Sequence, residues 1–314
     1  MSDFGYHILG FGAFTRPPVD TSAIILCAGG YATVNEIDRL LSTSQASATD
    51  FGDLNAGRRG LRGTGNNTKA LFGGGYISAD SDQIDRVNIQ STGNAVDWAN
   101  LTVARNDLSG SCANDTISMF CGGYTSSYQN VIDKNLFASQ ANSVDYGNLV
   151  VSGTGGQTGG GSSTRAICRS GGNGGSGALE SIDYKAFSSS SDCSDFGDMG
   201  VTADYPTGFS SSTYYFMASG WLTGSTYRDD IRKVNIASTG SGSDWGDVTS
   251  GGAYHGSGAS SKVRGFIFGG NKGSNTNDID YVSLTSASNS ADWGDLQSAK
   301  QAMAGASSND GAKA

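Results

Sequence analysis

Pairs of acidic side chains at an almost constant spacing are the residues of this sequence best suited to chemistry. One motif, Asp-aromatic-small-Asp/Asn-apolar, occurs in six copies whose lead aspartates are 47 to 50 residues apart. The copies begin at Asp50-Phe51, Asp97-Trp98, Asp145-Tyr146, Asp195-Phe196, Asp244-Trp245 and Asp292-Trp293. Two carboxylates so close in sequence could supply oxygen ligands to Ca²⁺. An aspartate at a turn can instead accept backbone N–H bonds while the adjacent ring packs between repeats.

We favour the structural role for these aspartates and predict no metal site. Asn100 and Asn148 replace the second aspartate in two copies. That change costs a turn little but would weaken a cation site, because a charged oxygen ligand is lost. Calcium at the six motifs is the alternative.

The sequence offers no candidate catalytic residue. Its two histidines are His7, near the start, and His255, in a glycine-rich segment. General base catalysis needs an imidazole with a positioned partner, and no such pairing is signalled. Glycine runs such as 159–161 are not followed by Lys-Ser or Lys-Thr, so they do not form a phosphate loop. We therefore expect a protein that is not an enzyme and holds no cofactor.

The cysteines have the pattern of buried core residues. Five are present, an odd number, so they cannot all pair. Cys27, Cys112, Cys121 and Cys168 stand in apolar or glycine-rich strand patterns, where free cysteine is commonly buried. We expect reduced thiols, with Cys112–Cys121 as the one disulfide worth checking.

Charge and composition exclude several classes of partner. The 314 residues carry 20 basic and 29 acidic side chains, a net charge of -9. Nucleic acid is disfavoured because phosphate binding needs a concentrated basic face. No apolar run approaches the roughly 18 residues of a membrane span, and the first twenty residues lack the pattern of a signal peptide. We therefore expect no membrane insertion and synthesis in the cytoplasm.

Three further segments recur with the acidic motif and complete a repeat of four strands. An isoleucine stands 13 residues before each lead aspartate, at Ile37, Ile84, Ile132, Ile182, Ile231 and Ile279. An apolar run ending in a glycine pair precedes each isoleucine, although the pair weakens to Ser219-Gly220 in the fifth copy. A strand of small residues precedes each run. Self-similarity at this period is typical of propeller blades, and the small residues suit strands crowded around an axis.

The repeat predicts an all-β fold, a six-bladed β-propeller with four antiparallel strands per blade. The expected blades span about 22–54, 55–101, 102–149, 150–199, 200–248 and 249–296 of a single domain over 22–314. Residues 1–21 form an N-terminal arm, and 297–314 supply an inner strand that closes the ring on the first blade. Residues 10–14 could close the ring instead. The fragment at Asp3 leaves seven blades as a minority alternative.

The loops after the glycine pairs vary in length and are the expected binding surface. Their aromatic residues are the candidates for ligand contact, namely Tyr76, Tyr124, Tyr128, Trp221 and Tyr227. A basic cluster of Arg58, Arg59, Arg62 and Arg105 is expected to form a solvated rim.

The double glycine, the aromatic start of the fourth strand and the period together resemble kelch-type β-propellers. More specifically, the string from Ile84 to Leu101 resembles tandem kelch-like repeats in structural proteins of marine tailed bacteriophages, especially cyanophages. This resemblance, from about Ala23 to Ser308, implies a non-enzymatic virion protein of the tail or head decoration, made in the host cytoplasm.

The resemblance also implies the partners. These are other virion proteins and, through the loops, a host cell-surface glycan or receptor; self-association into a homo-oligomer stays open. Two other classes compete with this expectation. One is an intracellular kelch-type scaffold that binds proteins, and the other is a glycan-processing enzyme.

Overall fold

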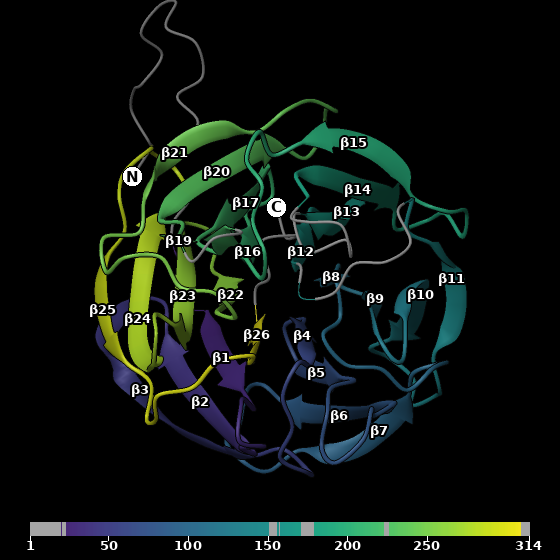
Figure 1. The fold of residues 1–314 in the computed structure, drawn as a ribbon. Coiled ribbons are helices and arrows are strands. Elements are labelled where there is room, and N and C mark those ends of the chain that lie inside the picture. The colour runs from purple at the N-terminus through teal and green to yellow at the C-terminus, as the bar shows by residue number, and fades with distance from the viewer. Residues whose placement is uncertain are drawn as a thin grey trace, which may run out of the picture.

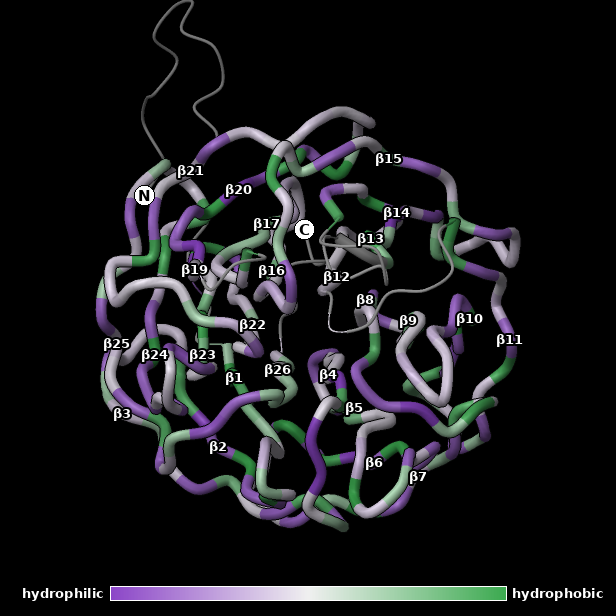
Figure 2. Tube along the Cα trace, viewed as in Figure 1, coloured by the Kyte–Doolittle hydropathy of each residue, from purple (hydrophilic) through white to green (hydrophobic). Residues whose placement is uncertain are grey.

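The fold is a six-bladed β-propeller, as the repeat predicts. A computed structural model describes residues 20, 23–150, 156, 158–170, 179–222 and 226–308. Six four-stranded antiparallel sheets surround a central axis, and the described residues contain no helix. Figure 1 shows the six sheets arranged as a ring. In Figure 2 hydrophobic segments recur in every blade, since each blade must bury both faces of its middle strands against its neighbours.

Each blade runs from an inner strand at the axis to an outer strand at the rim. Blade 1 comprises β26 (Ala304–Ser307), β1 (Ile24–Ala28), β2 (Glu36–Leu41) and β3 (Ser44–Asp53). Blade 2 comprises β4 (Arg62–Gly65), β5 (Lys69–Gly73), β6 (Gln83–Asn88) and β7 (Val96–Asn100). Blade 3 comprises β8 (Gly110–Ala113), β9 (Ile117–Tyr124), β10 (Tyr128–Leu136) and β11 (Val144–Asn148).

The remaining three blades follow the same order. Blade 4 comprises β12 (Thr158–Gly161), β13 (Arg165–Ser170), β14 (Ser181–Ala186) and β15 (Ser194–Asp198). Blade 5 comprises β16 (Thr207–Ser210), β17 (Tyr214–Ala218), β20 (Asp230–Asn235) and β21 (Ser243–Asp247), with a small hairpin of β18 (Trp221–Leu222) and β19 (Thr226–Tyr227). Blade 6 comprises β22 (Ser257–Ser260), β23 (Arg264–Asn271), β24 (Asn275–Ser283) and β25 (Ala291–Asp295).

The C-terminal strand closes the ring. β26 pairs antiparallel with β1 from Ile25↔Ser307 to Ala28↔Ala304. This pairing covers an edge of β1 that would otherwise be free to associate with other chains. The alternative closing segment, 10–14, and the rest of the predicted arm apart from Asp20 lie outside the described residues. Asp20 bridges blades 1 and 6 through Ser42 and Arg264.

The repeated aromatic residue sits in a bulge of each outer strand and is buried between blades. In blade 1 the register shifts so that Asp38 pairs with Asp50 and Ile37 with Gly52, which leaves Phe51 as the extra residue. Bulges redirect side chains in this way. The six rings are at most 9% exposed. Their backbone carbonyls and side chains form hydrogen bonds with the next blade. For example, Trp245 Nε1 donates to the carbonyl oxygen of Ser283 over 2.9 Å.

The turn before the next outer strand locks onto each bulge through hydrogen bonds. The amide of Gly93, in blade 2, donates to Phe51 O over 2.8 Å, and Asn94 Oδ1 accepts the amide of Asp53 over 3.1 Å. Equivalent side-chain bonds reach the amides of Asn100, Asn148, Asp247 and Asp295. The turn Ser91–Asn94 and its equivalents therefore hold the outer strand of the previous blade, which accounts for the constant spacing of three residues between Asn94 and Asp97 and between their equivalents.

The aspartate after each repeated isoleucine anchors the connection into its blade. Asp85 accepts the amide of Asn55 over 3.0 Å, and Asp38, Asp133 and Asp183 accept equivalent amides. A buried cation from the same connection completes three of these sites, at Arg58–Asp85, Arg105–Asp133 and Lys300–Asp38. In blade 5 Arg232 replaces the aspartate and donates to carbonyls instead.

The expectation of a solvated arginine rim is wrong for Arg58 and Arg105. Both side chains are fully buried, because each meets an acid of the following blade. Arg62 lies in the central channel, and Arg59 is half-buried between two tyrosine rings. The sequence pattern does not reveal this, since the partner acids are about 27 residues further along the chain.

Closure by β26 predicts that two C-terminal truncations differ sharply. A chain ending at Met303 lacks the strand, so we expect the free energy of unfolding to fall by about 3 kcal/mol or more, a large share of the usual total. A chain ending at Ser308 keeps the strand and is the control. Urea unfolding followed by circular dichroism measures both. Equal stability of the two truncated chains would show that β26 does not close the ring.

Removal of one buried cation should destabilise the protein much more than removal of a surface cation. Lys300→Met leaves Asp38 buried without its partner, at an expected cost of about 3–5 kcal/mol. Lys272→Met removes a partly exposed pair with Asp278 and should cost at most about 1 kcal/mol. The same urea titration compares them. Similar losses for both variants would contradict the anchoring role of Lys300.

Candidate functional site: channel mouth and loop face

The central channel is narrow because the inner strands almost touch. A Cβ on Gly63 would lie 2.4 Å from Gly305 O, and one on Gly258 would lie 2.5 Å from Gly208 O. Small residues are therefore required on these strands. Ser111 Oγ donates to Gly63 O over 2.7 Å and Ser260 Oγ to Ser210 O over 2.6 Å, which ties adjacent inner strands together.

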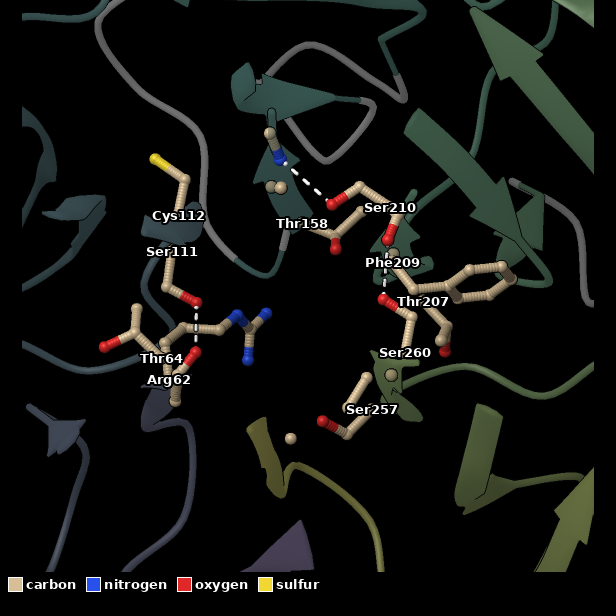
Figure 3. A pocket seen from close by; sticks show the side chains of 18 of the residues that line it. Arg62, Thr64, Ser111, Cys112, Thr158, Thr207, Phe209, Ser210, Ser257 and Ser260 are labelled. Carbon is tan, nitrogen blue, oxygen red and sulfur yellow. Dashed lines mark hydrogen bonds between the residues drawn. The ribbon is translucent and has the colours of Figure 1, made fainter. Parts of the chain in front are cut away.

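The space left in the channel is polar and small. Its volume is about 60 Å³, which roughly five water molecules would fill. Figure 3 shows the guanidinium of Arg62 reaching into this space among the hydroxyl groups of the inner strands. The channel itself is thus too small for an extended ligand, and recognition has to take place at its mouth.

A ring of six residues with left-handed backbone surrounds the channel mouth. One comes from each connection between blades: Gly60, Asp107, Gly156, Tyr205, His255 and Ala302, with φ between 42° and 66°. Backbone hydrogen bonds join neighbours in the ring, including Ala302 N to His255 O over 2.7 Å and His255 N to Tyr205 O over 3.1 Å. The connection geometry imposes this backbone conformation in every blade.

Bulky residues at two of these positions are energetically unfavourable. Glycine adopts a left-handed conformation without strain, as at Gly60 and Gly156, whereas Tyr205 and His255 do so at a cost of order 1 kcal/mol each. The two rings stack at 3.6 Å between centroids. Strained residues of this kind cluster at functional sites, so the mouth is a candidate binding site.

The residues that follow the glycine pairs stand beside this ring. Isolated bridges join Arg59 to Tyr76, Asn106 to Tyr124, Asp204 to Trp221 and Tyr254 to Asn271. Each bridge links a connection between blades to the loop after a glycine pair. All of these loops therefore lie on one side of the disc, which we call the loop face.

Aromatic side chains on the loop face form three groups. The largest, which we call the aromatic cluster, contains Trp221, Tyr227, Tyr254, Tyr205 and His255. Tyr254 is its centre, with the rings of Trp221 and Tyr227 both at 6.1 Å and that of Tyr205 at 6.4 Å. These rings are half-buried, so one side of the cluster is open to solvent.

The other two groups belong to blades 1 to 3. Arg59 stacks between Tyr31 and Tyr76, at 4.5 and 5.1 Å from the ring centroids. Tyr124 and Tyr128 make an edge-to-face pair at 5.1 Å. Tyr31 and Tyr124 are the most exposed aromatic residues of this face, at 47% and 38%.

Burial sets the protonation of the charged groups at the mouth. It lowers the pKa of His255 to about 3, with the positive charges of Arg62 and Arg59 acting in the same direction. It also raises the pKa of Asp107, against the effect of the same two arginines, and the pKa of Asp204. Asp204 is buried, and its Oδ1 lacks a hydrogen-bond partner among the described residues.

The structure brings all five predicted loop residues to the loop face. Tyr76, Tyr124, Tyr128, Trp221 and Tyr227 each take part in one of the three groups. Three further residues, Tyr205, Tyr254 and His255, come from the connections between blades; the sequence pattern did not indicate the two tyrosines and predicted no catalytic role for His255. Their signal is weak, because a single aromatic residue after an outer strand resembles ordinary core.

The repeated aspartates do not lie on the loop face. They lie exposed on the outer strands, where Asp50 Oδ1 accepts the amide of Gly52 over 3.0 Å and Asp145 and Asp195 repeat the contact. Over the described ranges, three cysteines form the one group of three or more possible metal-ligating side chains.

No protein-family model and no curated protein matches the chain. The structure also contains, over its described residues, no helix long and apolar enough to cross a membrane. The candidate site therefore stands on the geometry of the loop face alone.

The half-buried position of His255, close to Arg62 and Arg59, predicts that its imidazole stays neutral in mildly acidic solution. In a His7→Gln variant His255 is the one remaining histidine of the sequence. Because the folded pKa is about 3 rather than 6.5, its carbon-13 shifts should stay constant from pH 8 to 5. Protonation then favours the unfolded chain, so stability contributed by this group is lost as pH falls below about 6.5. Titration in the folded state near pH 6.5 would contradict the buried stack.

Proposed function

We propose that the protein is a non-enzymatic recognition module, and that its loop face binds a partner at the channel mouth. The supporting observation is the aromatic cluster, which contains Tyr205 and His255 at positions where glycine would be less strained. Rings that are half open to solvent offer large apolar contact with little loss of side-chain entropy, and such residues dominate binding energy at interfaces. A rigid six-bladed ring holds them in place.

A glycan is the ligand that suits this surface best. The apolar face of a sugar ring packs on aromatic side chains, and its hydroxyl groups need hydrogen-bond acceptors. Asp204, on the connection bridged to Trp221, has an Oδ1 without a hydrogen-bond partner among the described residues; because this oxygen is buried, a sugar hydroxyl group reaches it only if the overlying side chains shift. A receptor protein or a neighbouring virion protein could use the same aromatic groups.

We further propose that the protein is a kelch-like structural protein of a tailed bacteriophage, located in the tail or head decoration. The resemblance of its repeat to marine phage proteins supports this assignment. A stiff disc with a single recognition face suits attachment to a particle. Purified particles of the encoding phage should contain the protein, detected by mass spectrometry and by antibody labelling in electron micrographs. Particles that lack it would exclude a virion role.

Binding through the loop face can be tested with two substitutions and a matched control. Trp221→Ala and Tyr254→Ala remove parts of the aromatic cluster and should weaken binding to a host glycan array or to host cells at least tenfold. Leu136→Ala removes an exposed apolar residue, 43% accessible, at the opposite end of blade 3 and should leave binding unchanged. If all three variants bind like the unchanged protein, the loop face is not the recognition surface.

One observation favours glycan hydrolysis as a second candidate. Burial raises the pKa of both Asp107 and Asp204, and the negative charge of each raises the pKa of Tyr205. A carboxyl group with a raised pKa can serve as a general acid. Our proposal predicts no turnover of model glycosides. Sustained hydrolysis that is lost in both Asp107→Asn and Asp204→Asn would establish the enzyme instead.

A further inference from the structure

Three thiols from two neighbouring blades converge in the core between blades 3 and 4. Cys112 is on β8, Cys121 on β9 and Cys168 on β13. Their sulfur atoms all lie within 4.8 Å of one another, and the residues are at most 3% exposed. Figure 3 shows Cys112 turning its sulfur away from the channel. All three are free thiols.

An irregularity in β13 brings the third thiol to the other two. The pairing of β13 with β14 shifts register between Ile167 and Arg169, so Cys168 is the extra residue of a bulge. The equivalent strands β1, β5 and β17 pair with the next strand without any shift, and in β9 and β23 the register shifts only after Cys121 and Phe268, at the glycine pair. A bulge redirects a side chain, and bulges are over-represented next to functional sites. Blade 4 thus departs from the repeat at the residue that completes the group.

A buried positive charge lies beside the thiols. Lys185 is 3% exposed, and its ammonium donates to Tyr146 O and lies 4.3 Å from the Tyr146 ring centroid. It has no ion pair with any carboxylate of the described residues, and the Tyr146 ring that it contacts belongs to the same buried cluster as the thiols. The same position is Val87, Val234 or Val282 in other blades. An unpaired buried ammonium calls for negative charge nearby, which ionised thiols would supply.

We propose that Cys112, Cys121 and Cys168 bind one Zn²⁺ ion as thiolates, with Cys193 as the fourth ligand. Zinc–sulfur bonds of about 2.3 Å in a tetrahedron place the sulfur atoms about 3.8 Å apart, and the three sulfur atoms lie within 4.8 Å of one another, so small shifts bring them to this separation. Cys193 packs in the same buried cluster, but its sulfur does not lie within 4.8 Å of all three others, so it completes the tetrahedron only after a shift of its side chain. Each thiol releases its proton to solvent as its bond to zinc forms. The ion and Lys185 together offset three of the four thiolate charges.

The ion would join blade 3, which supplies two ligands, to blade 4, which supplies the other two. The site is shielded from solvent, so the metal has to enter while the chain folds. Bound zinc then stabilises the folded state, because the unfolded chain does not hold four thiolates together. This zinc site is independent of any ligand that binds at the loop face.

The test uses the full chain folded in the presence of zinc. Native mass spectrometry should show one zinc ion per chain, and Cys168→Ser should lose it. Cys27→Ser changes a buried thiol in blade 1, away from the group, and should keep the ion. Zinc-loaded protein should melt on the order of 5 °C above the zinc-free protein.

Cobalt substitution keeps the test decisive if Cys168→Ser does not fold. Unaltered protein folded with Co²⁺ should show intense thiolate-to-cobalt absorption and the visible bands of a tetrahedral site. The proposal is overturned if these bands are absent, if the folded protein contains no zinc, or if Cys168→Ser retains the ion. A Cys112–Cys121 disulfide found in the native protein by peptide mapping would also overturn it.

Discussion

The close contact between each outer strand and the next blade is the constraint on which this structure depends. The bulge directs an aromatic ring into the gap between blades and at the same time brings the backbone of the strand against the neighbouring turn. A Cβ on Gly52, Gly197 or Gly246 would lie within 2.4–2.7 Å of a carbonyl oxygen of that turn. The five-residue motif is therefore a joint between blades.

The joint explains how a chain rich in glycine and poor in apolar residues forms a rigid ring. Each interface combines a buried aromatic residue with hydrogen bonds to the outer strand across the gap, and in every blade but the fifth an aspartate holds the connection that enters the blade. Because these contacts use the outer strands and the connections, the loops after the glycine pairs are free to vary. These loops can therefore carry different aromatic residues in different blades. The ring of left-handed residues fixes the positions of the aromatic groups around the channel mouth.

Much of the fold follows from the sequence because the repeat encodes local contacts at fixed separations. The number of blades and the four strands per blade could be predicted from the spacing of Ile84 and Asp97 and their equivalents. The burial of Arg58 and Arg105 could not be predicted, since a basic residue in a loop is expected to be exposed to solvent unless the position of its partner acid is known. The aromatic loop residues were found because their loops vary in length. Tyr205 and His255 were missed because left-handed backbone leaves no sequence signal at a non-glycine residue, and Tyr254 was missed because a single aromatic residue after an outer strand resembles ordinary core.

The blade joint can be tested by adding a single methyl group. Gly246 and Gly240 have nearly the same φ, 152° and 157°, but a Cβ on Gly246 would lie 2.4 Å from Ser288 O while one on Gly240 meets nothing within 4 Å. Any backbone strain is thus shared, and the difference reports the contact between blades. The free energy of unfolding, measured in urea, should fall by at least about 2 kcal/mol more for Gly246→Ala than for Gly240→Ala. Equal losses would contradict the close joint between blades.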